Sequence, residues 1–167
     1  AICTLIVYGA TSNIDRPNGE RKIAVEDFCV GPGKTVLKNG ELLVSISVPK
    51  PDERSGAAYE RFIPRNEMDI AVAAVAVSVV IDNTGENFES ANIALASVGP
   101  TPIVARKASD YLAGKPINDA SISEASSIAK DESSPISDMR GTIEHRKHLI
   151  EVLTNRMIKE SVKRARG

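Results

Sequence analysis

One stretch constrains the fold more than any other, because residues 74–81 alternate two kinds of side chain with the period of a β-strand. Branched side chains alternate with small ones, Val75, Val77, Val79 and Ile81 against Ala74, Ala76 and Ser78. Successive side chains of a strand point to opposite faces, so the branched residues line one face and the small ones the other. A sheet face of this kind can accept helices.

Strand patterns flank this stretch on both sides. Residues 59–63 alternate as a strand should and precede a loop at residues 64–68. A turn at residues 82–85 leads into a second apolar run at residues 90–98, which predicts an antiparallel hairpin.

Three helices are predicted after the hairpin. In the first, Thr101 is the expected N-cap, Pro102 the first helical residue and Gly114 the stop, with an inward face of Ala105, Ala108 and Leu112. In the second, Ser121 and Glu124 fit a capping box, with Ile122, Ala125 and Ala129 inward. The third starts near Thr142 and carries the stripe Ile143, Leu149, Ile150, Leu153 and Met157.

The order of these elements, strands first and helices afterwards, predicts an α+β fold for residues 52–167. We expect an antiparallel sheet of three or four strands with three helices packed on one face. The basic end of the last helix, residues 159–166, complements the helix dipole and is predicted to be a solvated tail.

The first 51 residues have a different character. Short strands are predicted at residues 10–14, 21–25 and 42–48, with a turn at 16–19. Three such strands bury little by themselves, so we expect this part to complete a larger β-rich domain. Residues 49–56 are rich in proline, glycine and charge, and they are the expected linker between a domain at 1–51 and one at 52–167.

The start of the chain is apolar over residues 1–8 but has no basic region and no cleavage site, so it does not read as a signal peptide. Because the chain starts inside this apolar element without an initiator methionine, we expect a natural N-terminus upstream of Ala1. The longest apolar run, residues 70–81, is shorter than the about 20 residues that a membrane-spanning helix needs.

Composition disfavours nucleic acid as a partner. The formal net charge is −1, and no Trp, three Tyr and three Phe leave few platforms for base stacking. Cys3 and Cys29 are too few for a zinc or iron–sulfur site, and reduced cytoplasmic thiols are expected.

Gly33-Lys34-Thr35 resembles the end of a phosphate-binding loop, but the rest of the motif fails. The glycine required five positions earlier is Phe28, and Pro32 lacks the N–H that a phosphate cradle needs. A helix should follow, whereas residues 41–48 alternate as a strand. Residues 31–33 are therefore predicted to be a turn that joins two elements.

Chemistry of the chain's own is not visible in the sequence. His145 and His148 share a helix side, but no third metal ligand is forced onto it and the neighbouring Arg146 and Lys147 oppose a cation. No nucleophile motif occurs and no carboxylate pair stands out, so either a cofactor supplies the chemistry or the chain is a binding module.

Several blocks, in the same order along nearly the whole chain, resemble the FAD-binding medium subunit of molybdenum hydroxylases, the family of aerobic carbon monoxide dehydrogenase and xanthine dehydrogenase. The blocks are DFCVGPGKT at 27–35, GELL at 40–43, RFIPR at 61–65, MDIA at 68–71, VGPTPIVAR at 98–106 and PISDMRG at 135–141. His145 departs from the family, which has an aromatic residue before the position of Arg146.

The resemblance implies that residues 1–51 are the end of an FAD-binding domain of the vanillyl-alcohol-oxidase type, and the remainder the family's flavoprotein C-terminal domain. It implies that Leu43 touches the flavin ring and that Arg61 is the cation beside it. The alternative role of Leu43 is that of a core strand residue, and the alternative role of Arg61 is that of a surface arginine. The loop 62–70 is similar to the family segment near the flavin.

The family's FAD takes electrons from iron–sulfur clusters on a small subunit, which draws them from a molybdopterin site on a large subunit. The glycine-rich turns that hold FAD pyrophosphate in the family are missing from this sequence, so stable FAD binding by the chain alone is in doubt. Two functions therefore remain open: an electron-transferring FAD subunit that passes electrons to an external acceptor, and a cofactor-free module that docks partner subunits.

Overall fold

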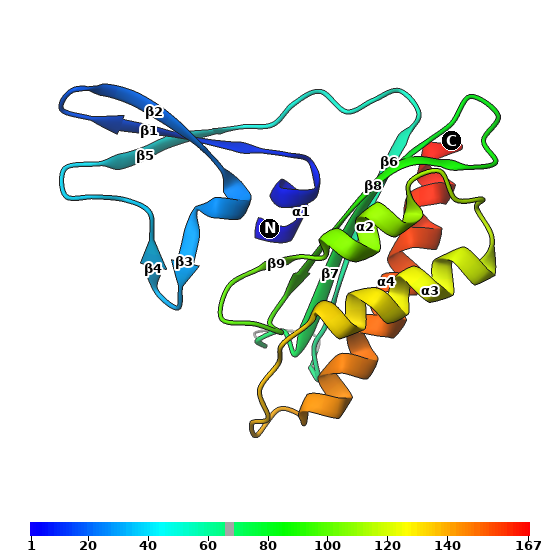
Figure 1. Cartoon of the computed structure of the whole chain (residues 1–167). Helices are drawn as coiled ribbons and strands as arrows, with labels where there is room; N and C mark the ends of the chain where they lie inside the picture. Colours follow the sequence, from blue (N-terminus) through cyan, green and yellow to red (C-terminus); the bar gives the residue numbers. More distant parts are fainter. Residues whose placement is uncertain (66–68) are drawn as a thin grey trace.

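The computed structural model describes residues 1–65 and 69–167, and Figure 1 shows that these residues form two larger sheets and a small hairpin, with helices packed on the second of the larger sheets. The first sheet belongs to the N-terminal 51 residues and the second to the remainder. The predicted α+β architecture is confirmed. In the described residues, no helix has both the length and the apolar character required to cross a bilayer.

The first sheet has the strand order β2-β1-β5, formed by β1 (Thr11–Arg16), β2 (Gly19–Ala24) and β5 (Leu42–Ser47). All neighbours are antiparallel, and the β1–β2 turn ends at Gly19, whose φ of 108° suits glycine. The three predicted strands are thus present. Ile14 is 1% exposed, while Leu42 and Val44 on β5 are 67% and 62% exposed.

A small hairpin stands between β2 and β5, after the short 3-10 turn η1 (Val25–Asp27). It consists of β3 (Cys29–Gly31) and β4 (Lys34–Thr35), with Gly33 at φ 67°. Lys34 and Thr35 lie in a strand and not at a helix start, so the interpretation of residues 31–33 as a connecting turn is confirmed.

The second sheet has the order β6-β7-β8-β9 and is antiparallel throughout. Its strands are β6 (Ser55–Phe62), β7 (Ala73–Ile81), β8 (Phe88–Ala96) and β9 (Ile103–Val104). Strand β6 starts at Ser55, so the end of the predicted linker is already sheet. The loop expected at residues 64–68 lies partly outside the described residues.

Three helices lie on the side of the sheet to which the branched residues of β7 point: α4 (Ile143–Ala165) packs on β6 and β7, α2 (Arg106–Leu112) packs on β8, and α3 (Asp119–Glu132) packs on these two helices (Figure 1). The main core joins these helices to the sheet, and its side chains of largest volume are Phe88, Ile93, Leu95, Leu112, Ile150, Leu153 and Ile158. The prediction that three helices pack on one face is confirmed. Close approach is possible because Gly56 on β6 has no side chain where α4 crosses it.

Three predicted helix details were wrong. The first helix starts at Arg106 and not at Pro102, because Ile103 and Val104 extend the sheet by pairing with Leu95 and Ala94. The second helix is capped by Asn118, whose side chain accepts a hydrogen bond from the Ser121 N–H, so Ser121 is inside the helix. Ile143 is 38% exposed and lies outside the buried stripe of α4.

The small face of the second sheet carries a fourth helix, α1 (Ile2–Val7), which the sequence did not predict. Cys3, Ile6 and Val7 pack in a second cluster with Ala76 of β7 and Ala94 of β8. Ser78 adds a hydrogen bond of 2.8 Å from its Oγ to the carbonyl of Val7. The small residues thus let a helix from the N-terminal part lie directly on the sheet.

Candidate functional site

Leu43 is the second residue of β5 and pairs with Ile14 of β1. The register shifts beside this pair, because Asn13 faces Ser45 while Ile14 faces Leu43 and Val44 has no partner. Such a bulge bends a strand and redirects its side chains, and bulges are common next to binding sites. Leu43 is half-buried.

An ion pair fixes the chain directly before Leu43. Arg21 holds both oxygens of Glu41, with Nε–Oε1 at 2.9 Å and Nη2–Oε2 at 2.6 Å. Its Nη2 also donates to the carbonyl of Val36, and the N–H of Lys38 donates to Glu41. The hydrogen bonds from Arg21 and then Lys38 lower the pKa of Glu41, so the carboxylate stays charged. Sequence reasoning missed Arg21, since nothing in the sequence pairs it with Glu41.

Arg61 is exposed near the end of β6, opposite Ala74 of β7. Alternation along β6 places it on the same face as Tyr59, away from α4 and toward the side that carries α1. Burial and the nearby Cys3 raise the pKa of the Tyr59 hydroxyl, and the charge of Arg61 opposes them. In residues 1–65 and 69–167, no ion pair involves Arg61.

The structure does not bring Leu43 and Arg61 into one compact site. They stand in different sheets, and Figure 1 shows β5 beginning at the end of the first sheet that points away from β6. Of the loop 62–70, residues 66–68 lie outside the described residues. Asp69 in this loop accepts from the Ile70 N–H and pairs with Arg65, at 3.5 Å. Burial opposes the effect, but this hydrogen bond and the charge of Arg65 lower the pKa of Asp69.

A cleft of about 620 Å³ opens beside this loop. Its walls are mostly apolar and include Pro32, Ile70, Pro100 and Ile136, and three side chains contribute charge, namely Asp138, Arg140 and Arg146. We call it the Arg146 cleft. Its volume lies within the range of about 300–1,000 Å³ that is typical of small-molecule sites.

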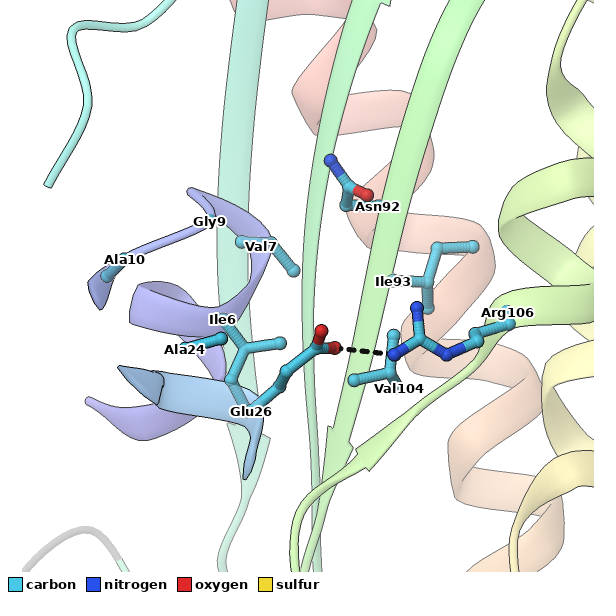
Figure 2. Close-up of a pocket in the computed structure, with 10 residues that line it drawn as sticks. All are labelled: Ile6, Val7, Gly9, Ala10, Ala24, Glu26, Asn92, Ile93, Val104 and Arg106. Atoms are coloured by element: carbon cyan, nitrogen blue, oxygen red, sulfur yellow. Dashed lines mark hydrogen bonds and ion pairs between the residues drawn. The ribbon is translucent and has the colours of Figure 1, made fainter. Parts of the chain in front are cut away.

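A second pocket lies where the N-terminal part meets the second sheet, between α1 and β8 (Figure 2). Glu26 and Arg106 form an ion pair of 2.9 Å across it, and Asn92 and Ile6 contribute to its lining. Its volume of about 160 Å³ is too small for a flavin. It is therefore a contact between the two parts of the chain and not a cofactor site.

The two histidines are both on α4 but do not share the same contacts. Both side chains are exposed, and the His145 ring meets Phe62 edge to face, with 6.0 Å between ring centroids. No cluster of three or more metal-ligating side chains is found in the part of the chain that the structure describes.

Two family models match the chain. Residues 57–161 match the CO dehydrogenase flavoprotein C-terminal domain, and residues 1–51 match the FAD binding domain in molybdopterin dehydrogenase.

Relatives and solved structures agree with these matches. A xanthine dehydrogenase FAD-binding subunit of Escherichia coli O157:H7 is 32% identical over 163 residues, covering 97% of this chain and 55% of the relative. A carbon monoxide dehydrogenase medium chain of Afipia carboxidovorans is 33% identical over 159 residues, covering 95% and 54%. A structure of reconstituted CO dehydrogenase from Oligotropha carboxidovorans superposes with a TM-score of 0.90 at 31% identity, covering 98% of this chain and 56% of that one. The chain thus spans about half the length of the curated relatives it matches.

Proposed function

Because the chain belongs to the family of the CO dehydrogenase flavoprotein C-terminal domain, we propose that it is part of the FAD-binding, electron-transferring subunit of a molybdenum hydroxylase. Bound FAD would supply the redox chemistry, taking electrons from iron–sulfur clusters and releasing them to an external acceptor. The proposed partners are a large molybdopterin subunit and a small iron–sulfur subunit in a cytoplasmic hetero-oligomer. The boundary between the FAD domain and the C-terminal domain is proposed at residues 51 and 52.

The observation that carries this proposal is the placement of Arg61. Its exposed cation stands on the face of the second sheet that is turned toward residues 1–51, the part that matches an FAD-binding domain. A guanidinium at that position can stabilise negative charge on a reduced flavin.

Leu43 fits the same cofactor if the ligand is elongated. Leu43 and Arg61 belong to different sheets, and an extended dinucleotide such as FAD has two separated ends that can reach both. We therefore assign Arg61 to the flavin end and propose an apolar contact of Leu43 with a more distant part of FAD. The expectation that Leu43 touches the flavin ring itself stays a prediction.

The rival function is a cofactor-free module that docks partner subunits. Titrating the chain with FAD separates the two hypotheses. A retained and shifted flavin absorbance band supports the FAD role for this chain, and no binding at high FAD concentration assigns this chain to docking, whatever the complete subunit does.

Leu43→Asp in the complete FAD subunit tests the first contact. A buried carboxylate beside an apolar part of the cofactor is expected to reduce FAD content about tenfold or more. Val44→Asp is the matched control, because Val44 is adjacent on β5 but 62% exposed. Equal FAD content in the two variants would remove Leu43 from the site.

Arg61→Ala tests the second contact. We expect the potential of the bound flavin to become more negative, because the reduced anion loses a stabilising cation, and Arg61→Lys should retain most of the wild-type potential. Arg156→Ala is the control, since Arg156 pairs with Glu60 on the opposite face of β6. A spectroelectrochemical titration in which Arg61→Ala and Arg156→Ala behave alike would refute the assignment.

The Arg146 cleft is our candidate entry for the external acceptor. Ile70 and Ala71 of its wall lie at the end of the loop 62–70, and this loop begins next to Arg61 on β6. Apolar walls with an exposed Arg140 suit a flat conjugated molecule.

A further inference from the structure

Arg146 is an almost completely buried cation in the wall of the Arg146 cleft. It lies on α4 and only 5% of its surface is exposed. A buried ion pair adds little net stability, and apolar residues of similar volume often do as well. A buried arginine at this place therefore needs an explanation other than stability.

Its guanidinium binds three separate segments of the chain. Nη1 donates to the carbonyls of Val72, at 2.7 Å, and Ser97, at 3.0 Å. Nη2 donates to both carboxylate oxygens of Asp138, at 2.7 and 2.8 Å. Within residues 1–65 and 69–167, the Nε has no hydrogen-bond partner, and the two terminal nitrogens hold these segments.

Each of the three segments forms part of the cleft. Val72 follows Ile70 and Ala71 of the wall, and its N–H closes the loop after β6 by donating to the carbonyl of Phe62. Asp138 begins the turn that presents Arg140, and its carboxylate also accepts from the Arg140 N–H at 2.8 Å. Ser97, in the third segment, lines the cleft itself.

Ser97 has a φ of 63°, a left-handed conformation that residues with side chains adopt only when their surroundings impose it. The bond from Arg146 to the Ser97 carbonyl is one such constraint. Arg146 thus fixes the relative positions of three segments: the end of the loop after β6, the end of β8 and the turn 138–141.

We propose that Arg146 is a positioning residue that sets the shape of the acceptor cleft and thereby the affinity of the reduced flavoprotein for its external acceptor. The inference rests on the proposed function, because it takes the cleft as the acceptor's entry. Arg146 acts through the three segments it holds and needs no contact with the acceptor.

Arg146→Lys is the test variant, because an ammonium keeps the charge but cannot make the two-oxygen contact with Asp138 and reach both carbonyls as well. Asp138→Asn is a milder second variant, since its side chain is 39% exposed and its loss should not prevent folding. Arg54→Lys is the matched control. Arg54 similarly links the Ile81 carbonyl, Asn83 and Glu89, but at the other end of β7.

The first measurement needs no cofactor. Trypsin is added to each native protein, and cleavage after Arg140 is followed by mass spectrometry. If Arg146 holds the turn 138–141, cleavage there should be about tenfold faster in Arg146→Lys, and unchanged in Arg54→Lys.

The second measurement uses the complete enzyme, reduced with dithionite and mixed with NAD⁺, 1,4-benzoquinone or molecular oxygen in a stopped-flow instrument. NAD⁺ and 1,4-benzoquinone are the two larger acceptors, and the comparison uses the one that wild type prefers. For this acceptor, we expect the half-saturating concentration to rise about tenfold in Arg146→Lys and less in Asp138→Asn, while the limiting rate stays within about twofold of the wild-type rate. Reoxidation by molecular oxygen, which is small enough not to need the cleft, should not change.

Unchanged acceptor affinity in Arg146→Lys would reduce Arg146 to a structural residue and overturn the inference, as would equal losses in Arg54→Lys. Failure of the proposed function looks different, because the wild-type enzyme itself would then contain no FAD in this subunit.

Discussion

Gly56→Ala is expected to destabilise the protein, because it places a methyl group against the backbone of α4. A methyl carbon at Gly56 would lie 2.1 Å from the backbone oxygen of Ser161 and 2.5 Å from the backbone nitrogen of Ala165. Non-bonded carbon contacts are normally about 3.5 Å. Helix α4 must therefore move away from β6 by about 1 Å, since both clashing atoms belong to its backbone.

The cost of this movement follows from what α4 holds. A gap of that size forfeits a quarter to a half of the dispersion contacts of Ile158 and Val162, which are 0% and 5% exposed. The hydrogen bond from Ser161 Oγ to the Val77 carbonyl, at 3.1 Å, is lengthened as well. Overpacking costs about 1–3 kcal/mol and a lost hydrogen bond about 1 kcal/mol, partly offset by the reduced freedom of the unfolded chain. We expect a net loss of about 3 kcal/mol of unfolding free energy.

Urea unfolding followed by far-UV circular dichroism measures this change. With a slope of about 1–3 kcal/mol per molar urea, the midpoint of Gly56→Ala should fall by about 1–3 M. Gly31→Ala is the control, because its methyl group would meet only the Lys34 side chain at 3.9 Å, and its φ is not positive. If the two variants unfold within about 1 kcal/mol of each other, α4 is not seated on Gly56 and the packing argument fails.

Two further predictions concern pH. Burial raises the pKa of Cys3 to about 11, against the opposing charge of the N-terminus, so the thiol contributes stability below pH 9.0 that is lost between pH 9.0 and about 11. The loss should be about 2–3 kcal/mol and absent from Cys3→Ala, and native Cys3 should resist a thiol reagent at pH 8 while Cys29 reacts. Hydrogen bonds from the side chains of Asn87 and Thr84 lower the pKa of Asp82, so its contribution is present above pH 3.8 and lost as the pH falls below that value. Melting curves of Asp82→Asn should show a weaker decline in acid than wild type, and parallel curves would contradict this account.

Part of the candidate site could be predicted from the sequence, and part could be found only in the structure. The resemblance selected Leu43 and Arg61 from the chain, and the strand patterns already placed them in different parts of it. The long-range contacts near the site escaped pattern reasoning, because Arg21 reaches Glu41 across 20 positions and Arg146 reaches Val72 across 74. Long-range partners of charged side chains leave no periodic trace in a sequence.

Local patterns determined most of the architecture. The alternation at residues 74–81 predicted a strand with one branched and one small face, and the absence of a helix after Lys34 excluded a phosphate loop, because both depend on backbone periodicity alone. Only the tertiary structure decided where residues 102–105 belong, since pairing of Ile103 and Val104 with β8 outweighed a local helix start signal. It likewise decided that α1 covers the small face of the second sheet, because burial of Ile6 and Val7 against Ala76 and Ala94 requires surfaces that are far apart in the chain.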